Sequence, residues 1–545
     1  MPTYQYDVVF IHPPAIFLED DYPLFPIPWS LEHIGSTSLT GNFPAGPAWN
    51  TPPMGLFTMK SFVEKNSSYS AEVFNLGLVG NPLDVERWVN GVYSSSRETI
   101  KAMLRQPQAD LFAVDIHWIV HSQGAIQTLK LLKEYHPQSY TVVGGFTASH
   151  FRHEIMKSFP FIDFVVIGDG SVPVVELLHQ IKGKKDFSKV PNLLYREGKK
   201  VRESPRAELN DFIWIQENQP TSDSIALGRG CPLQCLHCGG SRYSSESILG
   251  YKRPQSYSID SILDKISKVA GTLGGNGEKP LVFLVHDPFV TIGKKQWYQL
   301  LDEIKRSGIQ VRLLIEFFIP HPPEDVYKIA ETVPGSDIHI SPESMDEHVR
   351  DAQKNRHFTN QAYINLFDTV NDIDHLGLNV WFMTGMAEDT RASVEKTLSF
   401  VKEYYSKIKN YEKKKMKYNE MLFLDPGSLG FDLPKTGYKV LYKTFAENMM
   451  SFAAPHFKYQ INYRTQHLDR KQIFDLTMYM HHEMNRLYLD HGVIAPDLYR
   501  KVEKYNDLLV EFAPKYDLAF TERHPKKRAE RFLKLGFSLI DRLQN

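Results

Sequence analysis

The chain has 545 residues, and its 63 Lys and Arg residues are balanced by 64 Asp and Glu residues. This balance excludes the basic footprint of a nucleic-acid-binding protein and the polybasic surface of a membrane-binding one, so we expect neither partner. The apolar runs are strand-sized and too short to cross a bilayer, and the first residues lack the cationic and apolar order of a secretory signal. We therefore expect a cytoplasmic protein of about two to four domains.

Strand-like apolar runs alternate with stretches of helical spacing from residue 7 to residue 182. This alternation predicts a parallel, doubly wound, Rossmann-like α/β sheet, whose ligands bind at the carboxyl ends of the strands. Gly144, Gly145, Gly168 and Gly170 follow two of these strands. Because glycine has no Cβ, we expect them to admit a bulky ligand close to the backbone. A domain that holds a nucleotide, or no cofactor, is the alternative.

A polar, proline-containing stretch at 190–215 includes a hairpin-like segment and predicts a linker to a second domain. A short strand is expected at 224–227, and all three cysteines follow it, as Cys231, Cys235 and Cys238. Cysteines used as small core residues would be scattered. Three thiolates this close on one loop are typical of a metal or an iron–sulfur cluster. They leave no cysteine for a disulfide framework, which suits a reducing cytoplasm.

A cubane iron–sulfur cluster with three protein ligands keeps one iron open for a substrate or cofactor. The alternative is a zinc site that adds His237 to the cysteines. His237 is adjacent to Cys238, and neighbouring residues rarely both reach one tetrahedral ion, so we favour the cluster.

Further strand-like runs recur at intervals typical of an α/β barrel, with helical spacing between them. Reactive groups in such barrels come from the loops after the strands, and the cysteine loop is one of these. The later runs are at 281–285, 311–317, 337–340, 379–383 and 421–424. From about Phe431 the pattern changes to helices, without strands.

The spacing Cys-x3-Cys-x2-Cys resembles the signature of the radical S-adenosylmethionine (SAM) enzymes. The resemblance implies a partial (β/α)6 barrel and a [4Fe-4S] cluster on Cys231, Cys235 and Cys238, whose open iron binds SAM. Ile340-Ser-Pro-Glu-Ser344, with Arg356 after it, and Met383-Thr-Gly-Met-Ala-Glu-Asp-Thr390 also resemble family motifs, although Ala387 replaces a proline.

The resemblance implies that Ser341 or Glu343 binds the SAM ribose, that Arg356 pairs with the methionine carboxylate, and that backbone near Gly385 meets the adenine. The alternative for Asp287, Glu343 and Arg356 is a structural or solvated ion pair. The full set of expected SAM contacts is His286, Asp287, Ser341, Glu343, Arg356, Met383 and Gly385.

Val143-Gly-Gly-Phe-Thr-Ala-Ser-His150 and the segment 163–171 resemble the cobalamin-binding domain that precedes many radical SAM enzymes, although Thr147, Asp169 and Ser171 depart from its usual residues. The first strand ends in His12-Pro-Pro, so we expect cobalamin with its own base detached and no assigned protein ligand. His117 and Trp118 are candidates for the lower face, and packing is the alternative for both. The expected cobalamin contacts are His12, His117, Trp118, Gly144, Gly145, Ser149, Gly168 and Gly170.

Over about its first 430 residues the chain thus resembles a cobalamin-dependent radical SAM enzyme. The predicted organisation is an α/β cobalamin-binding domain at 1–189, a linker at 190–215, a radical SAM barrel at 216–430 and a mostly helical domain at 431–545. Such C-terminal domains often cap the active site.

The resemblance implies an anaerobic C-methyltransferase that acts on an unactivated carbon through a 5′-deoxyadenosyl radical and methylcobalamin, with ferredoxin or flavodoxin as electron donor. The substrate is expected to be a protein side chain, such as in methyl-coenzyme M reductase, or a small molecule. The alternatives are a rearrangement or cyclisation enzyme acting on a lipid, tetrapyrrole or natural-product intermediate, and a cobalamin or cluster sensor without turnover.

Overall fold

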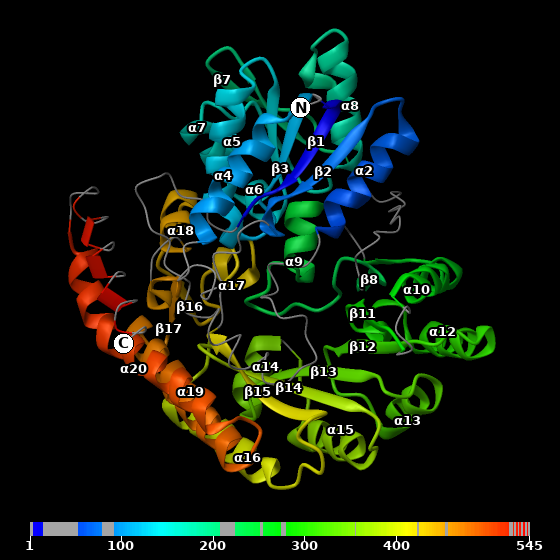
Figure 1. The fold of residues 1–545 in the computed structure, drawn as a ribbon, viewed down its shortest axis with the longest axis vertical. Helices are drawn as coiled ribbons and strands as arrows, with labels where there is room; N and C mark the ends of the chain where they lie inside the picture. Colours follow the sequence, from blue (N-terminus) through cyan, green and yellow to red (C-terminus); the bar gives the residue numbers. More distant parts are fainter. Residues whose placement is uncertain are drawn as a thin grey trace.

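The computed structural model describes residues 4–14, 53–78, 92–207, 224–250, 254–273, 279–354, 356–421, 424–452 and 456–522, with isolated residues between 527 and 542. In this part of the chain two α/β units and a C-terminal helical unit lie against one another (Figure 1).

The N-terminal unit is a seven-stranded sheet, with helices on both faces and the strand order β2-β1-β3-β4-β5-β6-β7. Its strands are β1 Tyr4–His12, β2 Ala71–Asn75, β3 Pro107–Asp115, β4 Tyr140–Gly144, β5 Phe164–Val166, β6 Leu193–Glu197 and β7 Lys200–Glu203. Its helices are α2 Met54–Asn66, α4 Val92–Arg105, α5 Ser122–Tyr135, α6 Phe146–His150, α7 Arg152–Ser158 and α8 Ser171–Lys182. The first five strands are parallel, as the alternating pattern predicts.

Alternate residues of β1 supply both sides of this unit's core. Val9 and Ile11 pack under α4 and α5, and Val8 and Phe10 pack under α2 and α8. A strand buried on both faces needs an apolar side chain at nearly every position, which explains the continuous run Val8-Val-Phe-Ile11.

The hairpin of β6 and β7 lies in the stretch that the sequence assigns to a linker. β6 pairs antiparallel with β5, with Phe164 opposite Tyr195, so the hairpin extends the N-terminal sheet. This sheet therefore continues to Glu203, whereas the sequence places the domain boundary at residue 189. Residues 208–215 of the expected linker lie outside the described residues.

The second unit is a six-stranded parallel sheet in the order β15-β14-β13-β12-β11-β8, which confirms the partial barrel. Its strands are β8 Ser224–Ala226, β11 Leu281–Val285, β12 Arg312–Phe317, β13 Asp337–Glu343, β14 Gly377–Thr384 and β15 Lys414–Met421. Its main helices are α10 Ile259–Leu273, α12 Lys294–Ser307, α13 Pro323–Thr332, α14 Glu347–Lys354, α15 Asn360–Asp372 and α16 Arg391–Tyr405.

The last barrel strand begins at Lys414, well before the predicted start at residue 421. Lysine side chains usually lie in solvent, yet Lys415 and Lys417 are buried. Nζ of Lys417 lies 4.6 Å from the centre of the Trp381 ring on the neighbouring strand, and burial lowers the pKa of Lys417 to about 7.

The C-terminal unit consists mainly of helices, namely α17 Leu429–Asp432, α18 Phe445–Phe452, α19 Arg470–Asp490 and α20 Pro496–Phe520. The expectation that this region has no strands is wrong, because β16 Tyr438–Val440 and β17 Tyr463–Thr465 form an antiparallel pair. No helix in the described ranges is long and apolar enough to cross a membrane.

The C-terminal unit joins the other two units. The Glu154 carboxylate on α7 accepts hydrogen bonds from Phe445 N (2.8 Å) and Ala446 N (3.1 Å), which caps the start of α18. Phe445 and Phe452 belong to the same apolar core as α4 and α5. On the barrel side, the Tyr488 hydroxyl of α19 donates to Met416 O at 2.8 Å.

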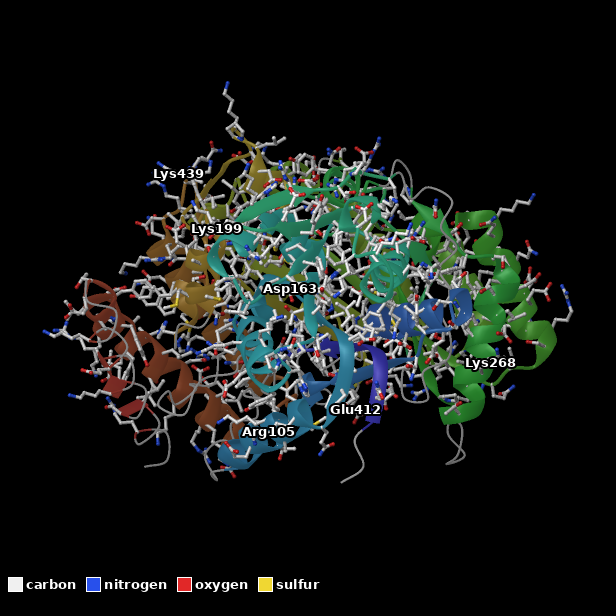
Figure 2. The ribbon with its side chains drawn as sticks, turned by 90° about the horizontal axis from the view of Figure 1, so that it is seen from above. Arg105, Asp163, Lys199, Lys268, Glu412 and Lys439 are labelled. Atoms are coloured by element: carbon white, nitrogen blue, oxygen red, sulfur yellow. The ribbon has the colours of Figure 1, made fainter. Side chains whose placement is uncertain are left out.

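Seen from above, Lys268 of α10 and Lys439 of β16 lie on opposite sides of Asp163, the residue just before β5 (Figure 2).

A buried ion pair connects the two α/β units directly. Arg229 lies on the short strand β9 (Gly228–Arg229), just before the cysteines, and its Nη1 lies 3.2 Å from Asp169 Oδ2. The two side chains are 10% and 3% exposed. The carboxyl edge of the N-terminal sheet is thereby attached to the residues that lead into the cysteine loop.

We expect Arg229→Met to lower the free energy of unfolding by about 3–5 kcal/mol, because it removes the cation that lies 3.2 Å from the buried Asp169 carboxylate. The double variant Arg229→Met/Asp169→Asn should recover most of this loss, as denaturant unfolding would measure. Lys409→Met breaks the exposed Lys409–Asp372 pair and should change nothing measurable. Equal stability of the single and double variants would contradict this account.

Candidate active site

The three cysteines lie on a loop between β9 and the short helix α9 (Arg242–Ser244), at the carboxyl end of the first barrel strand. All are free and half-buried. Leu233 N lies 3.4 Å from Cys231 Sγ and Gly240 N lies 3.3 Å from Cys238 Sγ, so backbone N–H groups donate to two sulfurs. Donors of this kind favour a negatively charged sulfur, which is the ligand form of cysteine.

The surroundings of the loop oppose free thiolates. Burial raises the pKa of the Cys235 thiol to about 12 and also raises the pKa values of Cys231 and Cys238. Bound metal must therefore replace the thiol protons. The described residues contain no three His, Cys, Asp or Glu side chains that converge on one metal ion. A cubane needs no such convergence, because each thiolate binds a different iron, and this donor set fits a cluster with one open corner.

Distant segments hold the loop in place through backbone bonds. Leu236 N donates to Gln353 O at 3.0 Å, and Leu236 O accepts from Gly430 N at 2.7 Å. Asp425 Oδ2 accepts from Gly239 N at 2.9 Å. The run from Asp425 to Gly430 thus holds the cysteine loop in place.

His237, the fourth ligand in the zinc alternative, has a protein partner. Its Nδ1 is hydrogen-bonded to Gln353 Nε2, and Gln353 Oε1 accepts from the Tyr438 hydroxyl at 2.7 Å. The side-chain amide of Gln353 is a donor, so Nδ1 is the acceptor in this bond and is not free to bind metal. His237 therefore links the loop to the C-terminal unit.

Three buried polar atoms at the ends of the barrel strands β11, β13 and β14 have no partner among the described residues: His286 Nδ1, Glu343 Oε2 and Thr384 Oγ1. His286 and Glu343 also adopt positive φ angles, of 80° and 70°, which residues other than glycine rarely adopt. An unpaired buried polar atom costs about 1–3 kcal/mol. Such atoms and such backbone strain cluster where a polar ligand binds.

Lys354 is a site residue that sequence reasoning missed. Its Nζ lies 3.3 Å from Glu343 Oε1, and both side chains are buried. Burial opposes the charge, but Glu343, Tyr363 and Cys235 hold the pKa of Lys354 above its ordinary value. The barrel thus keeps a cation beside the cysteine thiolates. The sequence feature that could have identified Lys354 is its position on the helix that follows the Ser341-Pro-Glu343 motif, two residues before Arg356.

Asp287 has a structural role instead of the expected SAM contact. Its Oδ1 caps the short helix α11 (Pro288–Thr291) by accepting from Phe289 N at 2.9 Å. Its Oδ2 accepts from Phe318 N at 2.8 Å and lies 3.1 Å from His321 Nε2. Both oxygens are therefore used to fix the loops after β11 and β12, as the structural alternative requires.

The other expected SAM residues are spread around the same end of the barrel. Arg356 is exposed, and its charge acts to lower the pKa of the Cys231 thiol, which places it beside the loop. Ser341 is half-buried within β13, and Met383 is half-buried against the barrel core. These three positions remain predictions.

Gly385 begins a loop that two other residues shape. Asp389 accepts hydrogen bonds from Gly385 N (2.9 Å) and Met386 N (3.1 Å). A Cβ on Gly385, whose φ is 98°, would stand only 2.2 Å from the hydroxyl oxygen of Tyr463. That hydroxyl is buried without a partner among the described residues. Tyr463 comes from β17, so its place in the site depends on a long-range contact that the sequence does not reveal.

A second group of candidate residues lies at the carboxyl edge of the N-terminal sheet. His12 Nδ1 lies 3.1 Å from Asp115 Oδ2, so Asp115 pairs with His12 and not with His117. Burial opposes the charge on Asp115, but the bond from His12 and the nearby histidines hold its pKa below the ordinary value. The His117 ring packs edge-on against Trp118, as the packing alternative describes.

Protein atoms fill the space beside three of the expected cobalamin glycines. A Cβ on Gly145 would stand 2.7 Å from the His117 backbone, and one on Gly170 would stand 2.9 Å from Met59 Cε. A Cβ on Gly168 would stand 3.2 Å from the backbone oxygen of Ile248, in the barrel unit. At these three glycines the missing side chain makes room for the protein's own atoms, and their contact with cobalamin stays a prediction.

Of the remaining two contacts, Gly144 has only distant neighbours, with Val166 Cβ 4.0 Å from its notional Cβ. Ser149 Oγ donates to Gly145 O at 2.7 Å and accepts from Gly168 N at 2.9 Å. Ser149 therefore ties the two glycine loops together, and the side chain is fully buried.

Comparison with known proteins places these features in a family context. Residues 225–401 match the family model of the radical SAM superfamily. An uncharacterised methyltransferase of Pyrococcus horikoshii is 24% identical over 294 residues, which are 51% of this chain and 61% of that relative. The chain therefore matches less than two-thirds of the relative's length.

Two solved structures share the fold over 99% of this chain. The radical SAM methyltransferase TsrM of Kitasatospora setae, with cobalamin and a [4Fe-4S] cluster bound, matches over 100% of its length with a TM-score of 0.58 and 12% identity. The cobalamin-dependent SAM radical enzyme OxsB, with aqua-cobalamin and SAM bound, matches over 80% of its length with a TM-score of 0.57 and 13% identity. Residues 225–401 thus match the radical SAM model, and the chain shares its fold with these two solved structures.

The carboxyl of Glu316, on β12, provides a test of the barrel's electrostatics. It accepts a bond from His286 N at 3.3 Å, and burial raises its pKa from 4.5 to about 7. Because the folded state holds this proton more tightly, the stabilisation is complete below about pH 4.5 and is lost as the pH rises to about 7.

Glu316→Gln should therefore show a smaller fall in unfolding free energy between pH 5 and pH 8 than the unaltered protein, by denaturant titration at each pH. Glu331→Gln, at an exposed position of α13, should keep the original pH dependence. Identical pH profiles for Glu316→Gln and the unaltered protein would refute the raised pKa.

Proposed function

We propose that this chain is a cobalamin-dependent radical SAM methyltransferase that methylates an unactivated carbon. The observation that carries the proposal is the cysteine loop with three free thiols at the end of the barrel where three buried polar atoms lack partners in the described residues. The doubly wound unit above this end supports a second cofactor, because such sheets bind ligands at their carboxyl edge. The fold shared with TsrM and OxsB supports the same assignment.

In this proposal Cys231, Cys235 and Cys238 hold a [4Fe-4S] cluster and leave one iron for SAM. The unpaired atoms of His286, Glu343 and Thr384 face the polar parts of SAM, and the backbone at Gly385 meets its adenine. The candidates for the methionine carboxylate are Arg356, as the sequence implies, and the buried ammonium of Lys354.

Cobalamin would occupy the carboxyl edge of the N-terminal sheet, near Gly144 and the His12–Asp115 pair. The Arg229–Asp169 ion pair and the contact of Gly168 with Ile248 hold that edge against the barrel unit. The chain thus fixes the separation of two cofactor sites, which is the positional requirement of a reaction that uses both.

When bound, the cluster and SAM supply a 5′-deoxyadenosyl radical that removes hydrogen from a carbon, and cobalamin supplies the methyl group. The protein's own task is to orient the partners and to keep the site closed. The buried Lys354 stabilises negative charge beside the thiolates, and the brace from Asp425 and Gly430 fixes the loop. No proton-transfer residue is required at the carbon.

The substrate in this proposal is a protein side chain or a small molecule. The electron donor is a ferredoxin or flavodoxin, and the enzyme works in an anaerobic cytoplasm. The C-terminal unit supplies Tyr463 to the barrel end, which supports a role in closing the site.

Anaerobically reconstituted protein, supplied with SAM and a strong reductant, should produce 5′-deoxyadenosine. Cys235→Ala should abolish it because the cluster loses a ligand, whereas Ser247→Ala, an exposed position near the loop, should retain it. Chromatography with mass detection would measure both. With substrate present, S-adenosylhomocysteine and a methylated product should appear. If deoxyadenosine forms together with a rearranged product that carries no new methyl group, the enzyme catalyses a rearrangement and not a methyl transfer. If SAM is not cleaved at all, the proposal of a radical SAM enzyme is refuted.

Thr384→Val should weaken SAM binding about 2- to 10-fold, which corresponds to the loss of one hydrogen bond of about 0.5–1.5 kcal/mol. Anaerobic equilibrium dialysis would measure the affinity. Thr128→Val, in α5, removes another buried hydroxyl that lacks a partner among the described residues, and it should leave the affinity unchanged. An equal affinity for Thr384→Val and the unaltered protein would exclude this hydroxyl from the SAM site.

A further inference from the structure

The topological switch point of the N-terminal sheet lies between β1 and β3. In the order β2-β1-β3-β4-β5, the chain leaves β1 towards one side of the sheet and continues from β3 towards the other. Doubly wound sheets bind their ligands outside the carboxyl ends of the strands at such a switch point. β1 ends at His12 and β3 ends at Asp115, so these two residues stand at the switch point.

His12 and Asp115 form one oriented pair. Nδ1 of His12 lies 3.1 Å from Asp115 Oδ2, and the two side chains are 8% and 15% exposed. A carboxylate only accepts hydrogen bonds, so Nδ1 carries the proton and donates it to Asp115. The imidazole is thereby held in the tautomer whose Nε2 presents a lone pair.

Nε2 of His12 is buried and has no partner among the described residues. The His12 ring packs edge-on against the ring of His121, with centroids 4.8 Å apart. On another side stands Gly77, where a Cβ would approach Nε2 to 3.3 Å. A buried acceptor without a donor is costly, and the surroundings therefore leave this lone pair for a group that the protein does not provide.

We propose that Nε2 of His12 is the lower axial ligand of the cobalt of bound cobalamin, and that Asp115 orients it. The inference rests on the proposed function, because it requires cobalamin at this edge. A histidine that binds metal through one nitrogen while its other nitrogen donates to a carboxylate is a recurrent ligand arrangement, and the carboxylate fixes the ring and strengthens the ligand. The lone pair of Nε2 forms the bond to cobalt and takes the place of the cofactor's own base.

His117 is the competing candidate within the described residues. Its ring packs edge-on against both Trp118 and Phe146, with centroids 4.6 Å and 5.0 Å away. Asp115, which would orient it, is bonded to His12 instead. His12 therefore has both the free lone pair and the orienting carboxylate.

Electron paramagnetic resonance of the cob(II)alamin-loaded full chain tests the bond directly. An axial nitrogen splits the cobalt lines into triplets, and nitrogen-15 in the ligand turns the triplets into doublets. Protein labelled with nitrogen-15 histidine and loaded with unlabelled cobalamin should give doublets. Triplets in the labelled protein would mean that the cofactor's own base is the ligand, and unsplit lines would mean that no nitrogen is bound. Either result would overturn the inference.

Variants identify the histidine in question. His12→Ala and His12→Gln should both lose the splitting while retaining cobalamin after gel filtration, whereas His117→Gln should keep it. Asp115→Asn should reduce the fraction of protein that shows it, since the ring is then less firmly oriented. Retained splitting in both His12 variants would refute the assignment. If the unaltered protein retains no cobalamin, the proposed function itself is refuted. If it retains cobalamin but shows no axial nitrogen, only the present inference is refuted.

Discussion

The structure depends on how one irregular loop is held. The cysteine loop has no regular secondary structure around its thiols, and its backbone groups are instead satisfied by segments from elsewhere in the chain. Gly239 N is bonded to Asp425, Leu236 O to Gly430 N and Leu236 N to Gln353 O. These bonds replace the ladder that a helix or strand would provide, and they fix three sulfurs before any metal arrives.

The same bonds determine how the three units fit together. The run from Asp425 to Gly430 that holds the loop continues directly into the C-terminal unit, whose α18 packs into the core of the N-terminal sheet. Arg229, just before the cysteines, is attached to Asp169 on that sheet's carboxyl edge. Both ends of the loop are therefore tied to the N-terminal unit, one directly and one through the C-terminal helices. A metal centre supported in this way is sensitive to events in all three units.

The sequence predicts those features whose evidence is local. The three cysteines lie within one short segment, and the alternation of strands and helices reveals both parallel sheets. The sequence does not predict the role of a residue when the residue that contacts it is far away in the chain. Asp287 resembles a ligand residue, but Phe318 N and His321 occupy it. Lys417 belongs to a residue type that usually lies in solvent, yet it is buried beside Trp381 of the neighbouring strand. The positive φ of Glu343 likewise has no signal in a single sequence.

Gly168 illustrates how a motif can carry a different constraint from the one it suggests. Its missing side chain admits the backbone of Ile248, so the residue sits in the seam between two units. A larger side chain at this position would push the two units apart and would change the distance between the two proposed cofactor sites. Substitution of Gly168 would then weaken cofactor binding as if the glycine touched the cofactor, although the atom beside it is the backbone oxygen of Ile248. The loss of binding at a glycine of this motif therefore does not by itself locate the corrin.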